Sequence, residues 1–164
     1  MDIVNLMNGT YSGSSPTLLD EGCLPSDLAA DQRNVIRAFT LTLRPSQHST
    51  DPRRIRQEYR NLVKNFVSNS RHGLFIETHY EFTQAMVLHF HGYTIGRKST
   101  VGTLFSRLRR WGGYTVVKTP HDLMKWIEYC SKEDVYPPTK HSIAPPIKGT
   151  GRRGFILDDQ KRKK

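Results

Sequence analysis

The chain has 164 residues and a formal net charge of +10 at pH 7, and this length fits one domain with terminal segments rather than two large domains. Its first 31 residues contain five acidic side chains and no Lys or Arg, so the remainder is strongly basic. A basic body indicates a phosphate-rich partner such as nucleic acid, although solubility alone explains part of such a charge.

Cysteine usage and hydropathy exclude two further classes of protein. Cys23 and Cys130 are the two cysteines and neither belongs to a paired spacing, which argues against a disulfide framework or a cysteine zinc site and favours a reducing compartment. The sequence has no apolar run long enough to cross a bilayer and no signal-peptide pattern at its start. We therefore expect a soluble intracellular protein with no membrane partner.

The first elements can be predicted in chain order. Residues 1–31 are rich in Gly, Ser, Asp and Pro without periodicity, which predicts a largely disordered leader. From residue 34 the apolar residues Phe39, Leu41 and Leu43 alternate with polar ones, which predicts a half-buried strand that ends at Pro45.

A helix and two strands follow. Asp51 and Pro52 have the chemistry of an N-cap and a first helical residue, and apolar residues then recur at helical spacing from Ile55 to Val67. Strands are predicted over 73–80 and 86–95, with a turn between them.

The second half of the chain repeats this pattern. Ser99 can cap a helix that Gly112-Gly113 ends, a strand is predicted over 114–118, and Thr119-Pro120 opens a last helix that runs to about Glu133. The order β-α-β-β-α-β with short connections predicts an α+β fold, in which helices pack on an antiparallel ferredoxin-like sheet.

The predicted domain therefore spans residues 32–135. Residues 136–164 contain two Pro-Pro pairs, three closely spaced glycines and a terminal Lys-Arg-Lys-Lys run. They predict an extended basic tail, whose end is either a nuclear-localisation or nucleic-acid-binding patch or a solvated charged segment.

His89 and His91 are the first candidate site residues. They flank Phe90 in the predicted strand 86–95, and because side chains alternate along a strand the two imidazoles share one face. Such a pair needs only one or two oxygen ligands to complete a divalent-metal site, and Glu81 is a candidate for one of them. Taken alone, the pair favours a solvated strand face over a metal site, and the rest of the sequence reverses that preference.

Tyr129 and Lys132 are the second pair of candidates. Three residues apart on the last predicted helix, they lie about 60° apart around its axis. A tyrosine near a metal and a cation is a plausible covalent nucleophile, because the developing phenolate needs stabilisation at neutral pH. The alternative is the ordinary polar edge of an amphipathic helix.

Three stretches together resemble a known family. Phe39-Thr40-Leu41-Thr42, His89-Phe90-His91 and Tyr129-Cys130-Ser131-Lys132 resemble, in order, the three motifs of the HUH endonuclease domain in the replication-initiator (Rep) proteins of circular single-stranded DNA viruses. The resemblance covers roughly residues 34–135. The ordered combination of motifs is more specific than any one of them.

The resemblance implies a nicking enzyme that starts rolling-circle replication. Tyr129 would attack a phosphodiester in an unpaired origin sequence, form a 5′-phosphotyrosine and free a 3′-hydroxyl, and reversal would rejoin a strand. Lys132 would position phosphate or stabilise the phenolate. The partner would be single-stranded DNA of an origin stem-loop. A helicase domain or partner would lie outside this chain, and the protein would act in a host nucleus if the virus is eukaryotic and otherwise in cytoplasm.

The resemblance also implies a metal site. His89 and His91 match the histidine ligands and Glu81 the preceding acidic ligand, with Glu77 as its competitor. The metal would be Mn²⁺ or Mg²⁺, and two histidines favour Mn²⁺. Glu133 and Asp134 are weaker candidates to approach the metal.

The faces around six basic residues are expected to meet phosphates, while exposed aromatics stack on bases. The candidates are Arg44, Arg97, Lys98, Arg107, Arg109 and Arg110. Two alternatives remain. One is a noncatalytic single-stranded nucleic-acid-binding module of RNA-recognition type, which shares the element order, and the other is an HUH transposase or plasmid Rep.

Overall fold

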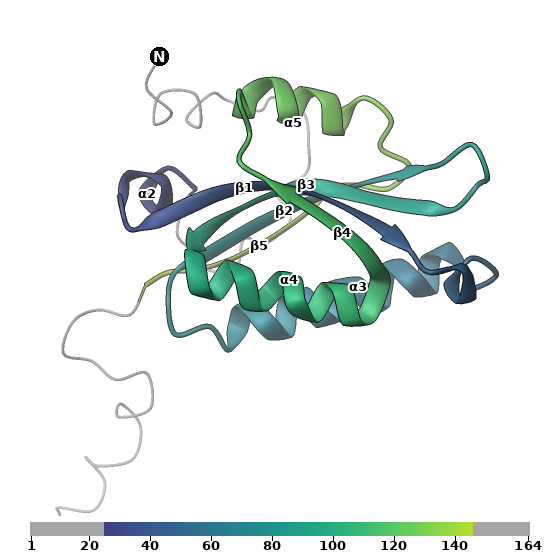
Figure 1. Cartoon of the computed structure of the whole chain (residues 1–164), viewed down its shortest axis with the longest axis horizontal. Coiled ribbons are helices and arrows are strands. Elements are labelled where there is room, and N and C mark those ends of the chain that lie inside the picture. The colour runs from purple at the N-terminus through teal and green to yellow at the C-terminus, as the bar shows by residue number, and fades with distance from the viewer. Residues whose placement is uncertain (1–24, 146–164) are drawn as a thin grey trace, which may run out of the picture.

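A five-stranded antiparallel sheet forms the centre of the computed structural model, which describes residues 25–145 (Figure 1). The strands are β1 (Asn34–Leu43), β2 (Leu74–Phe82), β3 (Leu88–Arg97), β4 (Gly113–Lys118) and β5 (Thr139–Ile143). The helices are α2 (Pro25–Ala30), α3 (Pro52–Ser68), α4 (Lys98–Gly112) and α5 (Leu123–Ser131), with a short 3₁₀ helix, η1 (Pro45–Gln47). The strand order is β4-β1-β3-β2-β5, and every neighbouring pair is antiparallel. The predicted α+β fold is confirmed.

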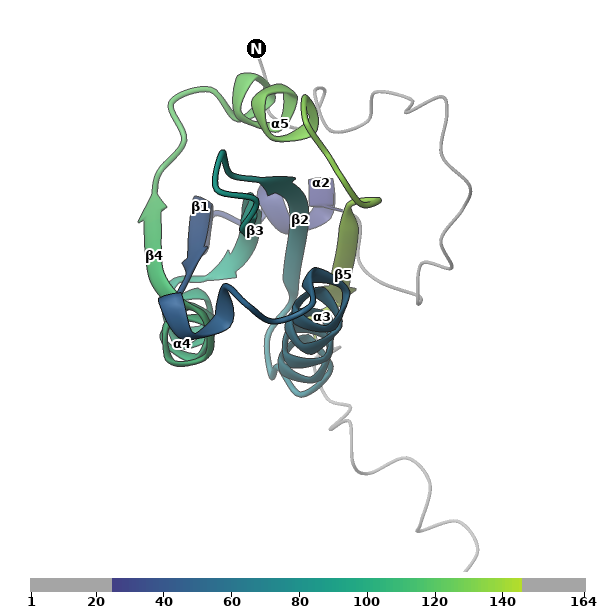
Figure 2. The ribbon, with the colours of Figure 1, turned by 90° about the vertical axis from the view of Figure 1, so that its right-hand side faces the viewer.

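The helices lie in two layers on opposite faces of the sheet (Figures 1 and 2). The main core lies between the sheet and the layer of α3 and α4, where Tyr59, Phe90 and Leu104 are fully buried. On the other face, a smaller core joins α2 and α5 to the sheet through Leu28 and Ile127. Alternate side chains of β3 therefore point to opposite faces of the sheet. Phe90 packs towards α3, while its neighbours His89 and His91 face the α5 side.

The sequence signals of α3 and of the end of α4 are confirmed. The side chain of Asp51 accepts a hydrogen bond from the Arg53 N–H, and Pro52 is the first helical residue. Gly113 follows α4 with a φ of 104°, a conformation that residues with a Cβ adopt only under strain. The predicted Ser99 cap is wrong. The helix begins at Lys98, and Ser99 lies in its first turn, where its carbonyl accepts a hydrogen bond from the Thr103 hydroxyl.

Several element boundaries differ from the prediction by a few residues. The strand predicted to end at residue 80 continues to Phe82, and the next begins at Leu88, because residues 83–87 form the turn and Met86 has a φ of 60°. The last helix begins at Leu123, since the Asp122 side chain caps it through the Lys125 N–H.

Two elements lie in stretches that the sequence predicts to lack regular structure. Helix α2 lies within the predicted leader 1–31, and its Leu28 is buried. Strand β5 lies within the predicted tail 136–164 and pairs with β2. Residues 1–24 and 146–164, including the basic C-terminal run, lie outside the described part of the chain. In the part that is described, no helix is long and apolar enough to cross a membrane.

Candidate functional site

The register of β2 and β3 brings Glu81, His89 and His91 together. Glu81 lies directly opposite His89, and His91 is the next residue of β3 on the same face. One ligand atom from each of the three side chains lies within 4.8 Å of the others, so the group could hold a metal ion. We call these three residues the triad. His91 is buried, while Glu81 and His89 are partly exposed, so a metal in the triad would remain open to a substrate on one side.

The electrostatics of the triad suit metal binding. Burial lowers the pKa of His89, and the neighbouring His91 lowers it further. Burial also lowers the pKa of His91, although the Glu81 carboxylate opposes this shift from 2.9 Å away. Both imidazoles are therefore neutral near pH 7, the form that binds metals. Two neutral nitrogens and one carboxylate oxygen fit a divalent cation that keeps further positions open.

Glu77, the alternative to Glu81 as the acidic metal ligand, is hydrogen-bonded to a different residue, His79. Its Oε1 accepts a hydrogen bond of 2.7 Å from His79 Nε2, and His79 Nδ1 donates a second one of 2.7 Å to Asp134 Oδ2. Burial works against protonation of His79, but these two carboxylates outweigh it and the net effect raises its pKa. Glu77, His79 and Asp134 thus form a second polar cluster behind the triad.

Asp134 ties the segment that follows α5 to β2. Its Oδ1 accepts a hydrogen bond from the Tyr80 N–H at 3.0 Å, and the next residue, Val135, donates its N–H to the Tyr80 carbonyl at 2.9 Å. Neither Glu133 nor Asp134 belongs to the metal-capable group found among residues 25–145. The sequence analysis missed this cluster. The alternation Glu77-x-His79-x-Glu81 in one strand is the signal that places all three side chains on a common face.

Helix α5 carries Tyr129 next to the triad. The indole N–H of Trp126 donates a 2.8 Å hydrogen bond to the Gly92 carbonyl on β3, which fixes the helix to the strand that bears the histidines. The Tyr129 ring stacks on Trp126, and its centroid lies 5.9 Å from that of His91. The Tyr129 side chain is 55% exposed, so its hydroxyl is accessible. Lys132 is the exposed C-cap residue of α5.

Strand β4 extends the same face beyond the triad. Pairing places Tyr114 opposite Thr42 and Val116 opposite Thr40, and these two threonines in turn lie opposite His89 and His91. Tyr114 is 71% exposed. Tyr114 is therefore an exposed aromatic residue on the triad face, separated from the histidines of β3 by strand β1.

The structure does not gather the predicted phosphate-contacting residues around the triad. Four of the six, Lys98, Arg107, Arg109 and Arg110, lie on α4, in the layer on the other face of the sheet. The Arg44 guanidinium donates a hydrogen bond to the Arg109 carbonyl of that helix. Arg97 is the last residue of β3, about 20 Å along the strand from His91 by the rise per residue, and it pairs with Asp31 at 3.7 Å.

Comparison with known proteins adds no relative. No protein-family model, no curated protein and no solved structure matches this chain. The triad, the tyrosine helix and their surroundings are therefore the observations on which function is inferred.

Proposed function

We propose that this protein is a metal-dependent endonuclease of the HUH type that nicks single-stranded DNA through Tyr129 to start rolling-circle replication. The observation that carries the proposal is the juxtaposition of an accessible phenol with a two-histidine, one-carboxylate group, with the Tyr129 and His91 ring centroids 5.9 Å apart. A covalent nucleophile beside a Lewis-acid site is the arrangement that a phosphodiester transfer needs.

The placement of the three motifs supports this proposal. The motif around Phe39-Thr40 lies on β1, the two histidines lie on the adjacent β3, and Tyr129 lies on α5, which packs on that strand. Thr40 and Thr42 share the face of the histidines. Three segments that are distant in sequence thus contribute to one face, as a shared catalytic role requires.

The proposed reaction transfers a phosphoryl group to the protein. The Tyr129 oxygen forms a bond to phosphorus as the P–O3′ bond breaks, the phenol loses its proton to solvent, and the departing 3′ oxygen takes up a proton. A divalent cation held by Glu81, His89 and His91 would polarise a phosphate oxygen, and the two nitrogen ligands favour Mn²⁺ over Mg²⁺. Lys132, at the end of the same helix, contributes a positive charge that favours phenolate and phosphate.

The substrate is an unpaired strand, because bases must be free to stack. Tyr114 and Tyr129 are exposed on the triad face, and aromatic platforms of this kind stabilise single strands by about 1–3 kcal/mol per stacked base. The resemblance to viral initiators suggests the loop of an origin hairpin as this strand.

A labelled oligonucleotide experiment tests the proposal. A pool of single-stranded oligonucleotides is incubated with the protein and Mn²⁺ or Mg²⁺, and a denaturing gel is used to detect a protein–DNA adduct. We expect an adduct with metal that Tyr129→Phe and His89→Ala abolish. Tyr114→Phe is the matched control, because it removes an exposed phenol from the same face and should leave the adduct intact.

Two results would count against nicking by Tyr129. An adduct that survives in Tyr129→Phe would assign the nucleophile elsewhere. Binding without any adduct, with either metal and across the whole pool, would instead support a noncatalytic single-stranded nucleic-acid-binding module.

A further inference from the structure

Within residues 25–145, half of the basic side chains lie on the layer formed by α3 and α4, which we call the helical face. Helix α3 contributes Arg53, Arg54, Arg56, Arg60 and Lys64 against one acid, Glu58, and α4 contributes Lys98, Arg107, Arg109 and Arg110 and no acid. On the opposite layer, α5 has one basic and one acidic residue, and α2 has one acidic residue. The two faces of the sheet therefore differ strongly in charge.

Most of this charge is available to a partner. Among the described residues, Arg54 is the only basic side chain of the helical face that forms an ion pair, and its partner is Glu58. Arg56 is turned inward, since its guanidinium lies over the rings of Tyr80 and Tyr136. All four basic residues of α4 are exposed and make no ion pair with the described part of the chain.

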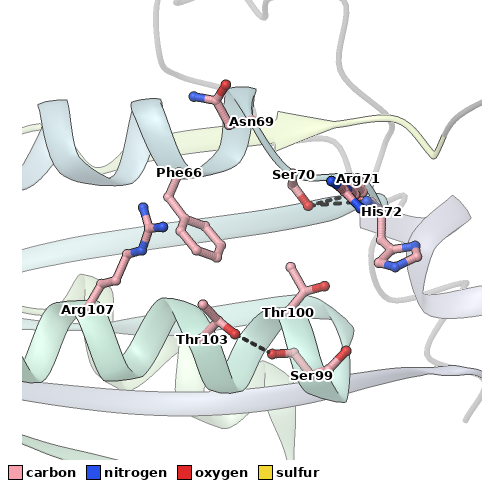
Figure 3. A pocket seen from close by; sticks show the side chains of 9 residues that line it. All are labelled: Phe66, Asn69, Ser70, Arg71, His72, Ser99, Thr100, Thr103 and Arg107. Carbon is pink, nitrogen blue, oxygen red and sulfur yellow. Dashed lines mark hydrogen bonds between the residues drawn. The ribbon is translucent and has the colours of Figure 1, made fainter. Parts of the chain in front are cut away.

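A groove of about 340 Å³ opens between α3 and α4 on this face (Figure 3). Phe66 lines the groove, and Arg107 lies over its ring at 5.2 Å. The loop after α3 adds Arg71, and the first turns of α4 add the hydroxyls of Ser99 and Thr100. The lining contains cationic and neutral polar groups but no carboxylate that would repel a bound anion.

The kind of nucleic acid follows from a second difference between the faces. Single-stranded binding surfaces combine basic side chains with exposed aromatics. Tyr114 and Tyr129, the exposed Tyr, Phe or Trp residues of the described chain, lie on the triad face, and α3 and α4 expose no such ring. A basic surface without stacking residues fits the phosphate backbone of a duplex, whose bases are already stacked.

We propose that the helical face, with the groove between α3 and α4, binds the phosphate backbone of double-stranded DNA, as a second nucleic-acid surface separate from the triad. Binding there is independent of sequence, and it does not depend on the nicking reaction. The 15 residues of α4 span about 22 Å, which is long enough to meet several phosphates of a duplex.

Salt dependence of duplex binding tests this surface. Fluorescence anisotropy of a labelled 20-base-pair duplex of arbitrary sequence would be measured in EDTA over a range of KCl concentrations. Each phosphate contact adds about 0.9 to the slope of log K against log salt concentration. We expect the triple variant Arg107→Gln, Arg109→Gln, Arg110→Gln to bind more weakly and to lower the slope by about 2 to 3.

Matched variants separate local contact from total charge. The variant Arg33→Gln, Lys118→Gln, Lys125→Gln loses the same charge outside the helical face, since Lys118 lies over Trp126 of α5, and it should keep the wild-type slope. Arg71→Gln with Lys98→Gln, at the other end of the groove, should lower the slope by about 1 to 2. Circular dichroism would check that each variant is folded. The triple variant of α4 should still form the metal-dependent single-strand adduct, which separates this surface from the proposed nicking activity.

The proposal is overturned if the wild-type protein does not bind the duplex. It is also overturned if the slopes of both helical-face variants equal the wild-type slope, or if the matched control loses as much slope as the α4 variant.

Discussion

Glu77 and Glu81 lie on the same face of β2 yet belong to different clusters. The antiparallel register sets Glu81 opposite His89, while Glu77 lies about 13 Å further along the strand and bonds to His79. The sequence could predict that Glu81 is nearer the histidines, because strand spacing decides it. It could not predict Asp134 as a partner of His79, because that contact joins residues 55 apart in sequence and no local pattern encodes it.

Asp134 offers a test of the second polar cluster at the level of one side chain. Asp134→Ala should lower the free energy of unfolding by about 2–3 kcal/mol, because it removes charge-assisted hydrogen bonds and leaves buried His79 without one carboxylate. Asp134→Asn should lose less, since an amide oxygen still accepts from the Tyr80 N–H. Urea denaturation would measure both.

The adjacent residue provides the control for this measurement. Glu133 is exposed, and Glu133→Ala should change the free energy of unfolding by no more than about 0.5 kcal/mol. If Asp134→Ala were as mild as Glu133→Ala, the attachment of α5 to β2 would have to depend on other contacts.

The helices and strands differ in how clearly the local sequence predicts them. Helix α3 was predictable at its start, because Asp51 and Pro52 supply both cap and first turn, and its long apolar stripe marked the buried face. Helix α2 has six residues and β5 has five, too few to show a period. Strand β5 is held by pairing with β2 and by the 2.7 Å contact between the Thr139 and Tyr80 hydroxyls, and such tertiary contacts leave no signature in the local sequence.

Alanine substitutions at two glycines test how closely the elements pack, and we expect opposite effects on stability from them. A Cβ on Gly92 would lie 1.9 Å from the Glu77 carbonyl on β2, whereas one on Gly102 would meet nothing within 4 Å. We expect Gly92→Ala to separate the central strands and destabilise the fold strongly. Gly102→Ala should stabilise α4 by about 0.5–1 kcal/mol through helix propensity. Thermal unfolding of both variants would measure the contrast, and a stabilising Gly92→Ala would contradict the strand register.

At the scale of the whole molecule, composition predicts a phosphate-rich partner. It does not predict which surface of the protein would bind that partner. Right-handed crossovers place the two helices of a β-α-β-β-α-β chain on one face of the sheet, and amphipathic patterning shows which side of each helix is exposed. The separation of basic charge from the triad arises when these rules act together. Helix α4 follows β3 in sequence but lies on the face of the sheet opposite α5 (Figure 1), whereas His91 of β3 contacts Tyr129 of α5.

Metal binding and folding should be coupled, because the triad draws ligands from two strands. Mn²⁺ at a hundred times its dissociation constant should stabilise the folded protein by about 2.7 kcal/mol, which corresponds to a rise in Tm of several degrees. His91→Ala should remove most of this rise. Differential scanning fluorimetry with and without Mn²⁺ would measure it.

His72→Ala is the matched control for this measurement. His72 is exposed in the groove of the helical face, away from the triad, and its substitution should leave the metal-induced rise unchanged. An equal rise in His91→Ala would place the stabilising metal outside the triad.

The attachment of α5 also has a mechanical consequence. In the proposed covalent complex, a DNA strand joined to Tyr129 would pull on a nine-residue helix, and two noncovalent attachments would share the tension with the backbone at the ends of the helix. One is the Trp126 hydrogen bond to Gly92, before the tyrosine, and the other is the set of Asp134 contacts beyond the helix end. These points lead into β3 and β2, which both have neighbours on either side in the sheet. The interior strands would thus take up part of a load that the backbone alone would pass to the edge strands β4 and β5.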